Sequence, residues 1–208
     1  MTKEKADKII TELSKHFTDK PALKFSTPYE LLVAVILSAQ CTDQRVNVVT
    51  EKLFKVSDTP EKMLELGVEK LKGYIFSCGL YKTKAEHIIS ASKDIIERYN
   101  GQVPNNLEDL RTLAGVGRKT ANVVYSVAFG GDAIAVDTHV FRVSNRIGLA
   151  NAKDVLKTEK DLKAIIDKSK WSKAHHYLIY LGRSYCKSQN PDCVNCPIKG
   201  DCEKKIKK

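Results

Sequence analysis

The sequence predicts an all-α protein, and two observations support this fold class. Apolar residues recur at helical spacing along nearly the whole chain, and no segment has the regular alternation of a convincing strand. The connections between these amphipathic stretches are short, as they are in packed helical proteins. With 208 residues, the chain is long enough for one large domain or two small ones.

In the first half of the chain, the clearest helix is expected from Pro28 to Ala39. Thr27 suits the N-cap, Pro28 suits the first turn, and Glu30 completes a capping box. This segment is apolar on most sides, so we expect it to lie at the centre of the core. The other helices expected before residue 101 are marked by Ile9–Phe17, Thr42–Phe54, Thr59–Leu66, Val68–Phe76 and Ile88–Tyr99.

The second half of the chain shows the same helical spacing, interrupted by glycine signals. Asn100-Gly101 ends one helix and Gly130-Gly131 ends another, because glycine readily adopts the left-handed conformation that closes a helix. Two helices are expected here from apolar residues at helical spacing: Leu107, Leu110 and Leu113 mark one, and Val123, Val124, Val127 and Ala128 mark the next. Helical stretches are also expected around Thr138–Ile147, Glu159–Asp167 and Lys173–Tyr185.

The chain carries a large positive charge. Its formal net charge is +10 and its pI is about 9.2, which favours a polyanionic partner such as nucleic acid. The longest apolar run, Leu31–Leu37, is far too short to span a bilayer. The N-terminal stretch Met1–Phe17 has no apolar signal segment, so we expect a cytoplasmic protein without a membrane partner.

Cys186, Cys193, Cys196 and Cys202 follow one another with the spacing C-x6-C-x2-C-x5-C. In a reduced compartment, a cysteine cluster of this density is more often a metal site than a disulfide scaffold. The spacing by itself leaves an iron–sulfur cluster and zinc both open, although zinc sites more often pair two Cys-x2-Cys units. Cys41 and Cys78 lie far away in apolar surroundings, and we expect both to be small buried residues.

A glycine turn lies between two expected helices at Leu113–Thr120. Gly115 and Gly117 permit a tight turn whose amides, with the N-terminus of the next helix, form an anion cradle suited to phosphate. Such contacts bind DNA without reading its sequence. Lys119 begins that helix, where the helix dipole and partial burial would favour a neutral, nucleophilic amine. A lysine that only contacts phosphate remains the alternative on these grounds.

Four segments together resemble a known family. LAGVGRKTANVV and AVDTHVFRVSNR are similar to the helix–hairpin–helix and Gly-Pro/Asp signature of the endonuclease III family of DNA glycosylases. LSAQCTDQRVN and GLYKTKAEHI resemble two further family segments, and the cysteine spacing resembles the family's [4Fe–4S] site. The similarity covers nearly the whole chain in order.

The resemblance implies a bifunctional DNA glycosylase and AP lyase that removes oxidised pyrimidines in base excision repair. Lys119 corresponds to the family's catalytic lysine, which forms a Schiff base with C1′ before β-elimination breaks the strand. Asp137 corresponds to the essential aspartate, which stabilises positive charge on the sugar. Asp137 is equally placed to cap the helix that starts at Thr138, and both roles could coexist.

The implied partner is double-stranded DNA containing damaged bases or abasic sites, bound by a monomer. Gln40 corresponds to the residue that fills the gap left by the flipped nucleotide, and Leu80 to an apolar wedge. The DNA-binding residues implied by the resemblance are Gln40, Leu80, Gly115, Val116, Gly117 and Arg118. The loop 187–192 carries one lysine where the family loop is basic, which puts its DNA role in doubt.

The resemblance also implies two domains. A helical barrel domain would span residues 22–131, with the helix–hairpin–helix at about 107–129, and a discontinuous cluster domain would combine residues 1–21 and 132–208. Lys119 and Asp137 would then face each other across a groove from different domains. Two alternatives are disfavoured: an adenine glycosylase would lack Lys119, and a non-catalytic DNA-binding module could dispense with both Lys119 and Asp137. A monofunctional glycosylase that acts on alkylated purines or mismatched thymine stays open as a third alternative.

Overall fold

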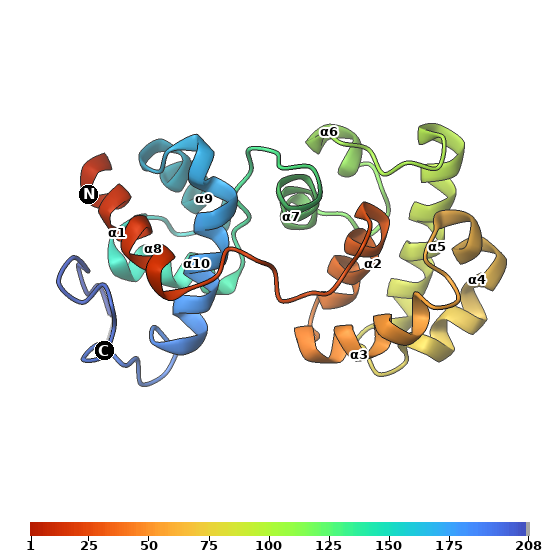
Figure 1. Ribbon diagram of the computed structural model, residues 1–208, viewed down its shortest axis with the longest axis horizontal. Helices are drawn as coiled ribbons and strands as arrows, with labels where there is room; N and C mark the ends of the chain where they lie inside the picture. Colours follow the sequence, from red (N-terminus) through yellow and green to blue (C-terminus); the bar gives the residue numbers. More distant parts are fainter. Residues whose placement is uncertain (207–208) are drawn as a thin grey trace. The chain divides into compact units, whose positions relative to one another are not determined.

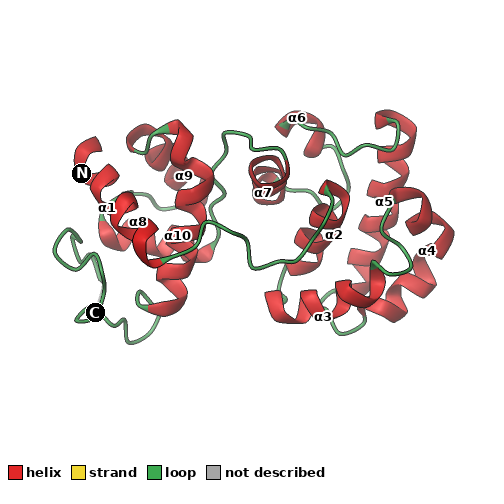
Figure 2. Ribbon diagram, in the orientation of Figure 1, coloured by secondary structure: helices red, strands yellow, loops and turns green. Residues whose placement is uncertain are grey.

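The computed structural model describes residues 1–206, and in that range helices are its regular elements and no strand is present (Figures 1 and 2). The predicted all-α class is confirmed. The elements are α1 (Lys3–His16), α2 (Pro28–Ser38), α3 (Asp43–Leu53), α4 (Pro60–Ile75), α5 (Tyr81–Tyr99), α6 (Leu107–Leu110), α7 (Arg118–Ala128), α8 (Thr138–Ile147), α9 (Val155–Ile165), the 3₁₀ helix η1 (Lys168–Lys170) and α10 (Trp171–Ser184). None of these helices is long and apolar enough to cross a membrane.

The chain divides into two compact units, one made of residues 1–20 and 132–208 and the other of residues 21–131. The first, described to residue 206, holds α1, α8, α9, η1 and α10; the second holds α2 to α7. Their assignment as a cluster domain and a helical barrel domain stays a prediction.

In the unit 21–131, α2 forms the centre of the core. Every residue from Tyr29 to Leu37 is buried, as the apolar sequence of this helix predicts, and α3, α5 and α7 pack against it. The Glu30 amide donates to Thr27 Oγ1 at 3.1 Å, as in a capping box. The Glu30 carboxylate, however, accepts from the Ser26 amide rather than from the amide of Thr27. The reciprocal bond of the expected box is therefore displaced by one residue.

The two helices expected at Thr59–Leu66 and Val68–Phe76 are joined in α4. Gly67 separates them, because its dihedral angles of φ 76° and ψ 161° are not helical. Glycine adopts a positive φ at no steric cost, so the helix can change direction here. Helix α4 packs beside α5.

In the unit that contains both termini, α10 packs against α1 and α8 around one apolar core. A Cβ atom at Gly182 of α10 would lie 3.0 Å from Cγ2 of Val143, so glycine permits the close approach of α8 and α10. Lys8 of α1 also pairs with Asp201 at 3.0 Å, which attaches the N-terminal helix to the C-terminal segment of the chain.

Helix α9 begins at Val155, four residues before the predicted start at Glu159, and ends at Ile165 instead of Asp167. Asp154 caps it, because its Oδ1 accepts from the Lys157 amide at 2.8 Å. Val155 and Leu156 are 46% and 51% exposed, so the first turn does not follow the apolar-inward pattern on which the prediction relied. Asp167 caps η1 instead of continuing α9.

Candidate nucleic-acid interface and metal centre

The turn between α6 and α7 has a geometry that requires glycine. The Val116 amide donates to the Leu113 carbonyl at 3.1 Å, and Gly115 between them has φ 76°. A Cβ atom at Gly115 would also lie 3.0 Å from Cβ and Nδ1 of His87 on α5. Conformation and space therefore both disfavour a larger residue at position 115.

The N-terminus of α7 is open to solvent. Gly117 is its N-cap, with no side chain bonded to the first-turn amides, and Gly115, Gly117 and Arg118 are all exposed. Within residues 1–206, no acceptor is found for the amides of Gly115 and Gly117. Val116 is different, because its side chain is buried and its amide is used inside the turn. An anion at this site would meet glycine amides and the positive end of a helix dipole.

Lys119 is the second residue of α7, as the sequence predicted, but its side chain is exposed. The expected partial burial is wrong for the chain without DNA. The reason is local: the first turn of α7 follows an exposed glycine turn, and only the later residues of the helix, from Ala121 onward, enter the core. Any desolvation of the amine has to come from a bound partner.

Asp137 is the N-cap of α8, so its predicted capping role is confirmed. Its Oδ1 accepts from the Val140 amide at 2.8 Å, and its Oδ2 lies 3.3 Å from Nδ1 of His139. The Asp137 side chain is 19% exposed, which leaves part of the carboxylate accessible. The loop before it is fixed from behind, where His175 Nδ1 lies 2.8 Å from the Ala135 carbonyl. In the sequence, only the adjacent pair His175-His176 hinted at this bond to the loop before Asp137.

Gln40 and Leu80 are both exposed and both adopt the left-handed backbone conformation, with φ values of 52° and 58°. This conformation costs a residue other than glycine about 1–2 kcal/mol, so the surrounding structure has to hold it. Their loops touch, because a Cβ atom at Gly79 would lie 3.1 Å from the Gln40 carbonyl oxygen. The structure thus brings these two predicted DNA contacts to one place, which their separation in sequence did not reveal.

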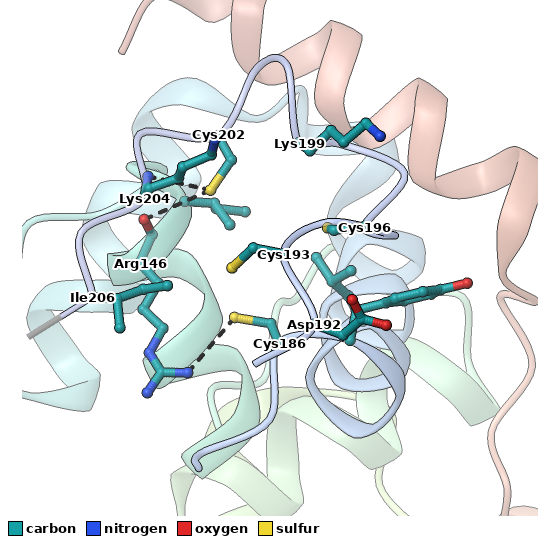
Figure 3. A pocket seen from close by; sticks show the side chains of 12 residues that line it. Arg146, Cys186, Asp192, Cys193, Cys196, Lys199, Cys202, Lys204 and Ile206 are labelled. Carbon is teal, nitrogen blue, oxygen red and sulfur yellow. Dashed lines mark hydrogen bonds between the residues drawn. The ribbon is translucent and has the colours of Figure 1, made fainter. Parts of the chain in front are cut away.

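Cys186, Cys193, Cys196 and Cys202 line one cavity at the end of α10 (Figure 3). Burial raises the pKa of the Cys196 and Cys202 thiols, and the Lys204 amide donates to Sγ of Cys202 at 3.3 Å. Among residues 1–206, no three His, Cys, Asp or Glu side chains are grouped closely enough to hold a single metal ion. Elsewhere, Cys78 is buried as expected, whereas Cys41 is only half-buried, contrary to prediction.

Arg146 of α8 organises the segment that carries these cysteines, a role that the motifs did not predict. Its guanidinium donates to the carbonyls of Lys187 at 2.6 Å and Ser188 at 3.0 Å, and lies 3.9 Å from Sγ of Cys186 (Figure 3). The Asp192 amide closes the same loop by donating to the Tyr185 carbonyl at 2.9 Å. The loop 187–192 is therefore held at both ends.

The fold and the hairpin define a class of DNA repair protein, since residues 33–168 match the HhH-GPD superfamily of base excision DNA repair proteins. The chain is 50% identical to endonuclease III of Haemophilus influenzae, an alignment that covers 100% of this chain and 99% of the relative. It is 48% identical to endonuclease III of Escherichia coli strain K12, with the same coverage. The chain belongs to the endonuclease III family, which confirms the resemblance found in its motifs.

Solved structures agree with this assignment. A trapped covalent intermediate of endonuclease III with DNA superposes with a TM-score of 0.92 at 47% identity, covering 98% of this chain and 97% of the other. A non-covalent endonuclease III–DNA complex gives the same TM-score and identity. A thermostable thymine-DNA glycosylase, 24% identical with a TM-score of 0.85, shares the fold.

Proposed function

We propose that this chain removes oxidised pyrimidines from double-stranded DNA and then cleaves the strand, with Lys119 as the nucleophile. The activity class follows from the family, because endonuclease III enzymes are DNA glycosylases with AP lyase activity in base excision repair. The observation that carries the proposal is the trapped covalent DNA intermediate of a protein 47% identical to this chain. A covalent intermediate requires a nucleophile, and Lys119 offers an exposed amine beside the open N-terminus of α7.

The proposed reaction starts when the neutral Lys119 amine attacks C1′ of the damaged nucleotide. The new N–C1′ bond replaces the glycosidic bond, and the base leaves and takes up a proton. The nitrogen then loses a proton, the ring oxygen takes one up as the C1′–O4′ bond breaks, and the ring opens to the protonated imine. Loss of a C2′ proton then expels the 3′ phosphate, and water hydrolyses the imine to regenerate lysine.

Asp137 would stabilise the positive charge that grows on the sugar as the base leaves. The Val140 amide fixes one of its carboxylate oxygens at 2.8 Å, so the group is oriented before substrate arrives. The positive end of α8 also favours the ionised carboxylate. One side chain can thus cap a helix and act in the reaction.

Access to the sugar requires the damaged nucleotide to leave the base stack. Leu80 is 59% exposed and would enter the stack as an apolar wedge, while the Gln40 amide would bond the orphaned partner base. The amides of Gly115 and Gly117 and the Arg118 side chain would hold backbone phosphates without reading sequence. Val116 would act differently from the initial expectation, as a buried anchor for the turn.

The four cysteines that line the cavity fit a [4Fe–4S] cluster, which is held by four thiolates that surround it. The donor set consists of sulfur, and the Lys204 amide supplies the kind of hydrogen bond to sulfur that tunes such clusters. When bound, the cluster would cross-link the segment 186–202 into a rigid body. The chain's own residues carry every step of the reaction on DNA.

Borohydride trapping tests the proposal. The wild-type protein should become covalently fixed to a duplex with an abasic site, because borohydride reduces the imine to a stable amine. Lys119→Ala should give no adduct, while Lys82→Ala, which removes another exposed lysine of the same unit, should leave it unchanged. An adduct that persists in Lys119→Ala would disprove the assignment.

Two controls complete this experiment. Wild type and Lys119→Ala should both be brown from cluster absorbance, and a colourless protein with stoichiometric zinc would refute the iron–sulfur cluster. Cleavage of a panel of defined lesions separates oxidised pyrimidines from alkylated purines and mismatched thymine, and preference for either of the latter would overturn the proposed substrate.

A further inference from the structure

We propose that Lys84 is a positioning residue that couples the Gln40 and Leu80 loops and holds both in the shape needed to open DNA. This inference rests on the proposed function, because it assigns Gln40 and Leu80 to the DNA. It concerns a residue that touches no substrate and acts through the backbone of two loops.

Lys84 lies on α5 and is buried, with 4% of its surface exposed. Its Nζ donates to two backbone carbonyls, Leu37 at 2.7 Å and Ala39 at 2.6 Å. Both carbonyls belong to the end of α2, where helical carbonyls lose their partners within the helix. A lysine cation at this end satisfies them and interacts favourably with the helix dipole.

The surroundings of Lys84 indicate that its buried amine is kept for these two bonds. Burial lowers the pKa of Lys84, and the thiols of Cys78 and Cys41 oppose that shift. Burial of an amine is unfavourable unless its hydrogen bonds are made. An apolar side chain of similar length could fill the same space without this cost, so packing does not account for a lysine here.

The two bonds act directly on Gln40. Helix α2 ends at Ser38, Ala39 has φ −59° and ψ 118°, and Gln40 follows in the left-handed conformation with φ 52°. The Lys84 amine fixes the carbonyl of the residue just before Gln40. A strained conformation persists only where its neighbours determine it, and this bond is one such constraint.

The main chain of Lys84 acts on the other loop. Its amide donates to the Leu80 carbonyl at 3.0 Å, in the first turn of α5, where Leu80 is the left-handed N-cap. Leu80 has no side-chain cap bond of its own. This is the first backbone bond of α5, which any residue except proline would make, so only the side-chain bonds to the Gln40 loop are particular to lysine. Lys84 links the two loops because its side chain holds the end of α2 from the helix that begins after Leu80. Gly79, which lies against the Gln40 carbonyl, completes the contact.

The experiment compares borohydride trapping rates on two substrates that carry the same abasic site. One is an intact duplex, and in the other the site lies opposite a one-nucleotide gap, so that no partner base needs a replacement. Lys84→Met should trap on the intact duplex at least about tenfold more slowly than wild type, because a hydrogen-bonded charge is lost. On the gapped substrate, the trapping rates of Lys84→Met and wild type should agree within about twofold, because Lys119 is unchanged in both. Lys82→Met, an exposed position on the same helix, should match wild type on both.

Equal slowing on both substrates, or unchanged trapping on the intact duplex, would overturn the role of Lys84. A merely structural defect predicts equal slowing, so the ratio of the two rates distinguishes the readings. If Lys84→Met does not fold, Lys84→Gln provides the same comparison, because its side chain is shorter than that of lysine and carries no charge. Failure of the proposed function is separate, because wild type would then trap on neither substrate.

Discussion

The N-termini of α7 and α8 differ in what faces the positive end of the helix dipole. Helix α7 starts at Gly117, which has no side chain, and its first turn is exposed. Helix α8 starts at Asp137, whose carboxylate accepts the Val140 amide at 2.8 Å. Both helices direct the positive end of a dipole at a potential anion. In α8 the anion is part of the chain, whereas no side chain caps α7, and the proposed function assigns that place to a phosphate of the DNA.

Under the proposed function, this difference would separate DNA binding at α7 from chemistry at α8. A glycine cap leaves backbone donors available and adds no charge of its own, which suits a site that must accept any DNA sequence. An aspartate cap keeps a carboxylate ionised and fixed in direction, which suits a group that must stabilise a cation. A change of the cap on α7 should therefore affect DNA binding, and a change of the cap on α8 should affect turnover.

The largest effect is expected from Asp137→Asn. Asparagine caps a helix as well as aspartate, so the melting temperature should change little. Turnover on a damaged base should fall by roughly 100-fold or more, because the stabilising charge is lost while DNA affinity remains. Single-turnover kinetics and a binding titration, run in parallel, measure the two quantities. Equal losses in turnover and affinity would show that Asp137 is only a cap and would break the comparison.

A smaller effect is expected from Gly117→Asp, which gives α7 the cap that α8 has. Gly117 has φ −80° and ψ 178°, and no atom lies within 4 Å of a Cβ there, so the substitution fits without strain. The new carboxylate should occupy the anion site and repel phosphate, lowering DNA affinity by about tenfold. Stability should rise by only a few tenths of a kcal/mol.

Gly117→Ala is the matched control for this change, since it adds a Cβ without a charge. It should retain most of the affinity, which filter binding at several salt concentrations would measure. An aspartate variant that binds as tightly as the alanine variant would show that the open end of α7 does not receive phosphate.

The smallest effect is expected from Asp154→Ala, which removes a cap at a helix without a proposed role in the reaction. Loss of the bond to the Lys157 amide should cost about 1 kcal/mol. For a protein of this size, that corresponds to about 2–4 °C in melting temperature. Borohydride trapping should be unchanged. A loss of trapping without a loss of stability would mean that α9 contributes to the site. The contrast between α7 and α8 would then not distinguish functional caps from structural ones.

Much of the fold could be predicted locally, because caps and apolar spacing act within a few residues. Thr27 and Pro28 mark the start of α2, and Gly67 separates the two halves of α4 as the sequence pattern indicated. The misplaced start of α9 has the same origin, since its exposed Val155 and Leu156 carry no inward-facing pattern. The start of α9 was therefore misplaced because it depends on the Asp154 cap, which is followed by apolar residues that are exposed.

The amino-acid sequence by itself determined the all-α class, the glycine hairpin, the cysteine spacing and the family, because these depend on residue types at fixed separations. Only the tertiary structure decided which distant residues meet. In the folded chain the Gln40 loop contacts Gly79, and the Lys84 amine bonds the carbonyls at the end of α2. Arg146 likewise bonds the loop 187–192. These contacts join residues far apart in the chain, and the free energy that selects them comes from packing and desolvation, which no local pattern records.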